Sequence, residues 1–177
     1  MEFRLDEALL LLGKTPAAVS ALVEGLPRAW TETSEEEWTV SGVVGHLIHG
    51  ENTDWVVRAK TILAHGERKP FEPFDRTAHR GLCADKPLSE LLAEFGRLRS
   101  MNLQSVRGME LDEAKLRLRG MHPALGPVTL GEYLAAWVVH DLSHLHQISR
   151  ILAMHYRAAC GPLSEYMGVL RPKAAKV

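Results

Sequence analysis

Apolar residues recur every three or four positions along most of the chain, the spacing that places them on one face of an α-helix. Val, Ile and Thr are not gathered into alternating runs, so long β-strands are not predicted. The pattern divides into four helical segments that are separated by irregular stretches. We therefore predict an all-α fold, a four-helix bundle in which residues 1–177 form a single domain.

The first predicted helix runs from Leu5 to Glu24 and contains a proline. Pro16 lacks the N–H that a helix interior needs, so we expect a kink or a restart near Lys14 rather than one straight rod. The second predicted helix begins after Trp38 and continues to about His65. Both helices carry enough apolar residues to cover one face of a bundle.

The second half of the chain contains two irregular stretches and two more predicted helices. Residues 66–86 are rich in proline and glycine and read as a long crossover connection. A third helix is predicted from Pro87 to Arg107, and a fourth from Thr129 to Tyr156. The intervening residues 108–128 form an irregular segment, in which the alternation at Leu116–Arg119 indicates a short strand or hairpin.

Composition and charge exclude several classes of protein. The chain is 46% hydrophobic and 24% charged, with a formal net charge of −1 and a pI near 6.8. No block of basic residues suits nucleic acid or an anionic membrane surface, so neither is expected as a partner. Two cysteines without metal-type spacing, an acidic N-terminus and the lack of a long apolar run favour a cytoplasmic protein.

Nine histidines are the unusual feature of the composition. His140 and His144 are four positions apart within the fourth predicted helix, so their rings lie one turn apart on the same face. Two imidazoles at this spacing can bind one metal ion. A catalytic zinc-type site usually has three protein ligands, so a third must come from another part of the chain.

The second predicted helix offers three candidates for the third ligand: His46, His49 and Glu51. On a helical wheel at about 100° per residue, His46 aligns with an apolar-to-small stripe that can face inward, whereas Glu51 points well away from it. Gly50, one turn after His46, would leave room for an ion and a substrate group. We therefore choose His46, and predict a metal site formed by His46, His140 and His144.

Asp141 is expected to have a different role from the histidine beside it. It projects roughly 100° from His140 on the wheel, so it cannot readily bond that ring. We predict that it is largely buried and bonded to another helix, to an arginine or to the His46 ring; the alternative is a solvated aspartate.

Simpler interpretations compete with a metal site. A histidine pair of this spacing is most often structural or incidental, and the remaining histidines, including His79, lie near predicted helix ends or in loops. The sequence has no glycine-rich phosphate loop, no nucleophile elbow and no His-Glu-x-x-His motif. It therefore identifies no catalytic residue and no site for an organic cofactor.

Three segments, in order along the chain, resemble the DinB superfamily, whose name refers to induction by DNA damage and implies no contact with DNA. They are Trp38–Leu47, similar to a Trp-Ser-x-x-Glu-x-x-x-His-Leu pattern, Pro127–Leu130, similar to the start of the last helix, and His140–Gln147, similar to a second ligand motif. One position departs from the pattern: Gly42 stands where the family usually has glutamate.

The resemblance implies a four-helix bundle, often dimeric, with three histidines on one divalent metal ion. Three neutral imidazoles suit zinc, nickel, copper or iron, and we expect zinc or nickel. The family's ligand positions map onto His46, His140 and His144. Several relatives transfer a small thiol to an electrophile, so we expect a metal-dependent thiol S-transferase, forming a homodimer, with a small-molecule thiol and an electrophile as partners. A metal-dependent hydrolase, or a metal-holding protein without turnover, stays as an alternative.

Overall fold

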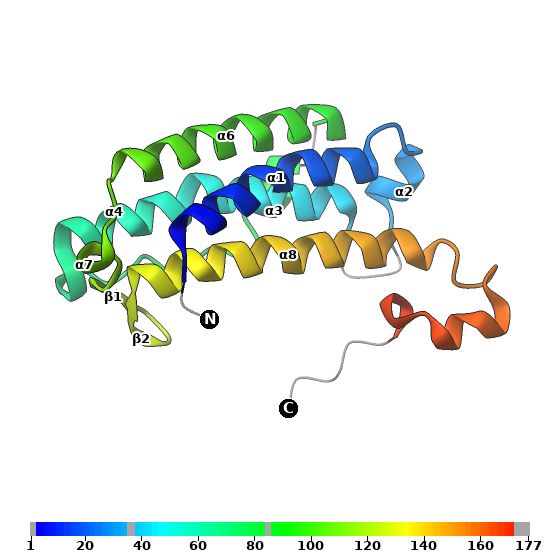
Figure 1. The fold of residues 1–177 in the computed structure, drawn as a ribbon. Helices are drawn as coiled ribbons and strands as arrows, with labels where there is room; N and C mark the ends of the chain where they lie inside the picture. Colours follow the sequence, from blue (N-terminus) through cyan, green and yellow to red (C-terminus); the bar gives the residue numbers. More distant parts are fainter. Residues whose placement is uncertain (1–2, 35–37, 84–85, 172–177) are drawn as a thin grey trace.

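A computed structural model describes residues 3–34, 38–83 and 86–171 of the chain. Its long helices pack side by side along one axis and confirm the predicted all-α, four-helix arrangement (Figure 1). The second of the four bundle positions, in chain order, is shared by two consecutive helices, α3 and α4. The long helices are α1 (Leu5–Val23), α3 (Val40–Thr53), α4 (Trp55–His65), α6 (Leu88–Gly108) and α8 (Leu130–Met154).

Helix α1 is continuous, so of the two outcomes predicted near Lys14, a kink or a restart, the restart is wrong. Pro16 lies inside the helix and cannot donate a hydrogen bond to the carbonyl of Leu12. That carbonyl is bonded instead by Nη1 of Arg99, at 2.8 Å, from helix α6. The tertiary bond satisfies the backbone group that proline leaves open, and the helix continues through it.

The second predicted helix is divided at Asp54, which corrects the expectation of one helix to His65. The backbone of Asp54 leaves the helical region (φ −114°, ψ −82°). Its side chain accepts a hydrogen bond from the hydroxyl of Tyr133 and pairs with Arg58 at 2.8 Å. This buried polar group fixes the bend between α3 and α4, and local periodicity could not reveal a partner 79 residues away.

Short elements connect the bundle helices. Strands β1 (Arg119–His122) and β2 (Gly126–Thr129) form an antiparallel hairpin in which Gly120 lies opposite Val128. The expected hairpin is therefore present, but its first strand begins at Arg119, later than predicted. The other short elements are α2 (Arg28–Glu32), η1 (Gly66–Arg68), α5 (His79–Cys83), α7 (Glu113–Leu116), η2 (Gly161–Tyr166) and η3 (Gly168–Leu170).

Both ends of α8 are fixed by specific hydrogen bonds. Thr129 and Glu132 form a capping box, in which each side chain accepts a bond from the backbone N–H of the other. Near the other end, Arg150 donates to the carbonyls of Val169 and Arg171, which holds the C-terminal segment against the helix. Across the described parts of the chain, no helix is long and apolar enough to cross a membrane.

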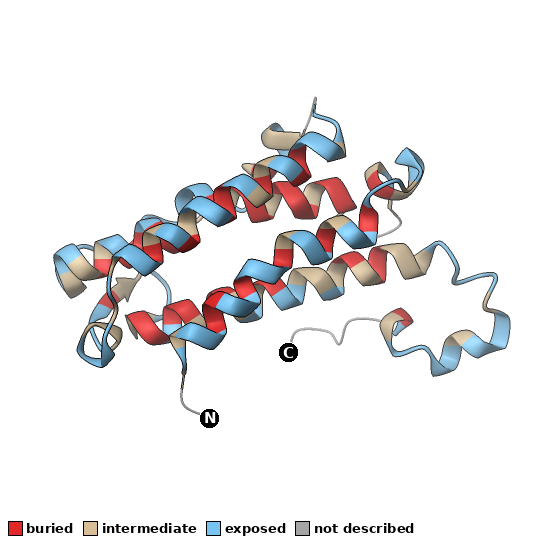
Figure 2. Ribbon diagram, turned by 45° about the horizontal axis from the view of Figure 1, so that its top comes forward, coloured by how far each residue is buried: buried red, intermediate tan, exposed pale blue. Residues whose placement is uncertain are grey.

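The apolar core is divided into two clusters at opposite ends of the bundle, and buried residues line the inner faces of the helices (Figure 2). On α1, for example, Leu12 belongs to one cluster and Val19 to the other. On α8, Trp137 and Ile148 are divided in the same way. The middle of the bundle, between the clusters, is occupied by polar residues: Thr15, His46, Glu51, Arg99, Asn102, His140, Asp141 and His144.

Candidate metal centre

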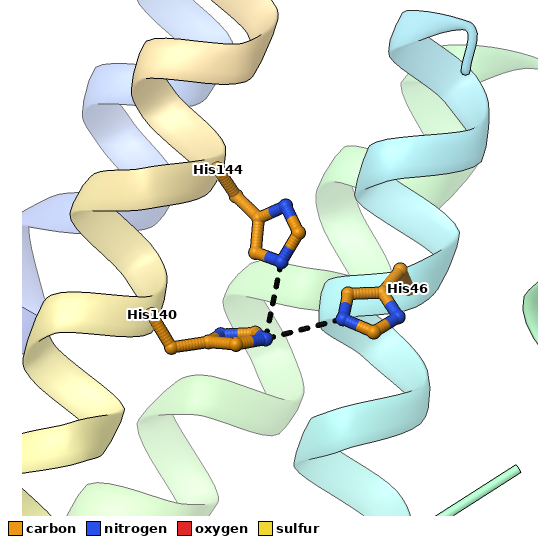
Figure 3. Close-up of side chains that lie close together, drawn as sticks. All are labelled: His46, His140 and His144. Carbon is orange, nitrogen blue, oxygen red and sulfur yellow. Dashed lines mark hydrogen bonds between the residues drawn. The ribbon is translucent and has the colours of Figure 1, made fainter. Parts of the chain in front are cut away.

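The structure brings His46 on α3 together with His140 and His144 on α8 (Figure 3). Nε2 of His140 lies 3.1 Å from Nε2 of His46 and 3.1 Å from Nε2 of His144. These three side chains are the group in the described residues whose ligand atoms could hold one metal ion. The geometry agrees with the predicted set, although metal binding itself stays a prediction.

The spacing of the ring nitrogens suits a single ion. Zinc–nitrogen bonds of 2.0–2.1 Å in a tetrahedral site separate neighbouring nitrogens by about 3.3 Å, close to the 3.1 Å observed. A neutral imidazole has one N–H and one lone pair, so three Nε2 atoms that face one another cannot all form hydrogen bonds together. A cation at their centre would bind the lone pairs that hydrogen bonding leaves unmatched.

The second nitrogen of each ring has a different environment. Nδ1 of His144 lies 2.8 Å from Oε1 of Gln147 on the next turn of α8. When Nδ1–H donates to this oxygen, the Nε2 lone pair of His144 faces the cluster. The Nδ1 atoms of His46 and His140 are buried and have no hydrogen-bond partner among the described residues.

His46 is held in its neutral form. Burial lowers its pKa from 6.5 to about 3, and the neighbouring His144 and His140 act in the same direction. A neutral imidazole is the form that binds a metal ion. The side chain of His140 is 25% exposed, so solvent reaches the cluster from one side.

Aromatic rings surround the cluster on the side of α3. Trp38 and Phe74 both contact the His46 ring edge-on, at centroid distances of 5.5 and 5.4 Å. Trp55 lies 5.0 Å from His140 and occupies the space beside Gly50, where its indole nitrogen would be 3.1 Å from an added Cβ. The expectation that Gly50 leaves room for an ion is therefore wrong, because that room holds the Trp55 ring.

His79 is a neighbour of the site that the sequence did not reveal. It is 7% exposed, stacks on Trp38 at 4.2 Å, and its centroid lies 6.1 Å from that of His46. Its helix, α5, lies close against α3 because position 45 is glycine: a Cβ there would overlap with Sγ of Cys83. The thiol of Cys83 donates to the carbonyl of Ser41 at 3.2 Å, and burial raises its pKa.

Asp141 is 1% exposed and bonded to Arg99, which confirms the prediction of a buried carboxylate paired with an arginine. Its Oδ1 lies 3.9 Å from Nδ1 of His140, beyond hydrogen-bond length. Burial opposes the ionisation of Asp141, but the approach of His140 and Arg99 outweighs it and holds the pKa of this carboxyl below its usual range. Glu51, which sequence reasoning placed away from His46, pairs with the same arginine at 2.7 Å.

The remaining candidates lie apart from the histidine cluster. His49 packs against Phe74, and His146 on α8 is exposed, as the helical wheel indicates. His122 accepts hydrogen bonds from backbone N–H groups in the hairpin, and His155 stacks on Trp30. None of these belongs to the group of converging ligand atoms within the described residues.

Comparison with protein families gives a match over residues 11–148, to the model of the DinB superfamily. This chain belongs to the DinB superfamily. The matched region extends from α1 to the end of the histidine motif on α8, and so contains all of the DinB-like segments seen in the sequence. A comparison with curated proteins gives no match.

Among solved structures, this DinB-superfamily chain is similar to YfiT from Bacillus subtilis, which is described as a probable metal-dependent hydrolase with an unusual four-helix bundle topology. The two chains share 24% sequence identity, with a TM-score of 0.74. The similarity covers 85% of this chain and 86% of YfiT. At this level of identity the match supports the fold, which agrees with the bundle described above.

Proposed function

We propose that this protein is a metal-dependent hydrolase whose divalent ion is held by His46, His140 and His144. The observation that carries the proposal is the convergence of three Nε2 atoms from two helices on one partly exposed point, with those of His46 and His144 each 3.1 Å from that of His140. Three protein ligands with solvent access are typical of catalytic rather than structural zinc sites. The description of YfiT as a probable metal-dependent hydrolase supports the choice of water as the nucleophile.

An ion bound there would act as a Lewis acid, polarising a carbonyl or phosphoryl oxygen and lowering the pKa of a water molecule. The chain itself would contribute orientation. Gln147 would fix the His144 ring, and the rings of Trp38 and Phe74 would limit how a substrate approaches His46. Thiol S-transfer, homodimer formation and the choice of zinc or nickel stay predictions, because neither the geometry nor the comparisons bear on them.

Two single substitutions on α8 test the proposal. His144→Ala removes one converging nitrogen, whereas His146→Ala makes the same chemical change on the exposed face of the helix. Proteins purified without a metal-affinity tag would be compared by elemental analysis, and then by hydrolysis of a panel of chromogenic carboxylic and phosphate esters. We expect His144→Ala to lose the metal and any activity while remaining helical by circular dichroism.

The control variant gives the contradicting outcomes. His146→Ala should retain both metal and activity. Equal loss of metal from the two variants would mean that the ligand face is wrongly assigned. A wild-type protein that contains no metal, and takes up neither zinc, nickel nor cobalt on titration, would refute the proposed site.

A further inference from the structure

Arg99 is an arginine almost completely buried in the middle of the bundle. It lies on α6 and is 1% exposed, with its guanidinium 5.0 Å from the Phe95 ring centroid and 4.9 Å from that of Trp137. A buried charge is costly unless it is paired and hydrogen-bonded. Its hydrogen-bond partners therefore indicate the role of this buried arginine.

The guanidinium group bonds three other helices. Nε and Nη2 donate to Oε1 of Glu51 on α3, at 3.0 and 2.7 Å. Nη1 and Nη2 donate to the carboxylate of Asp141 on α8, at 2.5 and 3.1 Å, and Nη1 also donates to the Leu12 carbonyl on α1. Asn102, one turn further along α6, donates to Oε2 and to the backbone carbonyl of Glu51. The planar fork of arginine suits this two-carboxylate arrangement, which a lysine could not reproduce.

The two carboxylates lie on the same helices as the histidines of the cluster. Glu51 follows His46 by five residues on α3, and Asp141 directly follows His140 on α8. Arg99 therefore joins the two helices that supply the cluster. It also holds Oδ1 of Asp141 at 3.9 Å from Nδ1 of His140, a buried nitrogen without a hydrogen-bond partner among the described residues.

We propose that Arg99 is a positioning residue for the histidine cluster, because it fixes α3 against α8 and holds the Asp141 carboxylate beside His140. This inference rests on the proposed metal binding. Metal–nitrogen distances tolerate deviations of only about 0.2 Å, so a small shift between the two helices would misplace His46 relative to His140 and His144. A carboxylate near the outer nitrogen of a ligating histidine also strengthens metal binding.

The test separates positioning from stability. The triple variant Glu51→Leu/Arg99→Met/Asp141→Leu removes all three charges and replaces them with apolar groups. Such replacements of buried ionic clusters often leave stability unchanged or increased. The matched control is Arg58→Met, which removes another buried arginine. Arg58 is paired with Asp54 and lies over Phe71, a member of the core cluster at the end of the bundle away from the polar layer.

Cobalt is the probe, because its visible absorption reports coordination geometry as well as occupancy. We expect the triple variant to melt cooperatively, to bind Co²⁺ at least tenfold more weakly than the wild type, and to show an altered absorption spectrum at saturation. We expect Arg58→Met to lower the melting temperature while its Co²⁺ affinity stays within twofold of the wild type and its spectrum is unchanged.

Two results would overturn the inference. One is a folded triple variant with wild-type affinity and spectrum; the other is an equal loss of affinity in Arg58→Met, which would assign the effect to general stability. If the triple variant does not fold, Arg99→Lys is judged by the same two measurements. A wild-type protein that binds no cobalt would refute the proposed function instead, so the two failures are distinguishable.

Discussion

Two polar clusters share the middle of the bundle, and they differ in how completely their atoms are paired. Around Arg99, the charges are hydrogen-bonded to one another or to the backbone of a neighbouring helix. Around His140, three ring nitrogens face one another, and the Nδ1 atoms of His46 and His140 have no partner among the described residues. Buried polar groups in proteins are nearly always satisfied, so the difference distinguishes a cluster that builds the fold from one suited to binding a ligand.

Both clusters occupy the middle layer of the bundle, between the two apolar clusters. Apolar packing at the two ends of the bundle can supply most of the stability, which allows the middle to contain polar groups. A site placed there is held by helices that are anchored on both sides. Substitution of Arg99 should therefore lower the stability of the protein, whereas substitution around the histidines should mainly weaken metal binding.

The largest effect is expected from Arg99→Met. This change leaves Glu51 and Asp141 buried without their counter-charge, which should lower the free energy of unfolding by about 3–5 kcal/mol. Urea denaturation of metal-free protein would measure it. Arg97→Met is the control, because Arg97 on the same helix is exposed and, within the described residues, is paired with Glu94 and with the thioether sulfur of Met101. That change should cost less than about 1 kcal/mol. Similar stability of the two variants would remove the distinction between the clusters.

A smaller effect, confined to metal binding, is expected from Gln147→Ala. The change removes the acceptor of the His144 Nδ1–H, so the affinity for zinc should fall about 10–100-fold with little change in the melting temperature of the metal-free protein. Competition with a chromogenic chelator would give the affinity. Ser143→Ala, an exposed position on the same helix, serves as the reference and should bind zinc like the wild type. A large loss of stability in Gln147→Ala would show that this part of the histidine cluster is structural.

The smallest effect concerns pH and the His46→Leu variant. An unfolded histidine takes up a proton near pH 6.5, whereas folded His46 resists protonation until about pH 3. Its contribution to stability is therefore fully present above pH 6.5 and is lost as the pH falls toward 3. Relative to His46→Leu, the metal-free wild type should lose roughly 1–2 kcal/mol between pH 7.5 and pH 5. Parallel pH profiles of the two proteins would argue against a neutral, buried His46.

Much of the fold follows from local periodicity in the sequence. The apolar spacing predicted α6 and α8 to within a few residues, and the capping box at Thr129 marked the start of α8. The two wrong predictions about the helices of the first half of the chain both involve a side chain from a distant helix. Arg99 bonds the carbonyl that Pro16 leaves open, so α1 continues, and Tyr133 bonds Asp54, where the second helix bends. The helical period of 3.6 residues depends only on neighbouring positions, so it cannot indicate hydrogen-bond partners from distant helices.

The candidate site could also be predicted in part from the sequence. The i, i+4 spacing of His140 and His144, together with the wheel position of His46, sufficed to select the three residues that converge. His79 was missed, because it reaches the site from α5, a short helix within a stretch whose sequence indicates only an irregular connection. Arg99 left a signal that could have been used: it is a charged residue on the apolar stripe of its helix, between Phe95 and Leu103.

The close contact between α3 and α5 has a consequence for how this sequence can change over time. A side chain at position 45 and a thiol at position 83 cannot occupy the same space, so each position limits the residues that the other can accept. Gly45 directly precedes His46, and α5 also carries His79, so the constraint acts on two residues of the site region. Among relatives that keep α5, alanine at position 45 should be accompanied by glycine or alanine at position 83. In the laboratory, Gly45→Ala should be poorly tolerated alone and partly restored by Cys83→Gly, because the backbone oxygen of His79 would still lie 3.3 Å from the added Cβ.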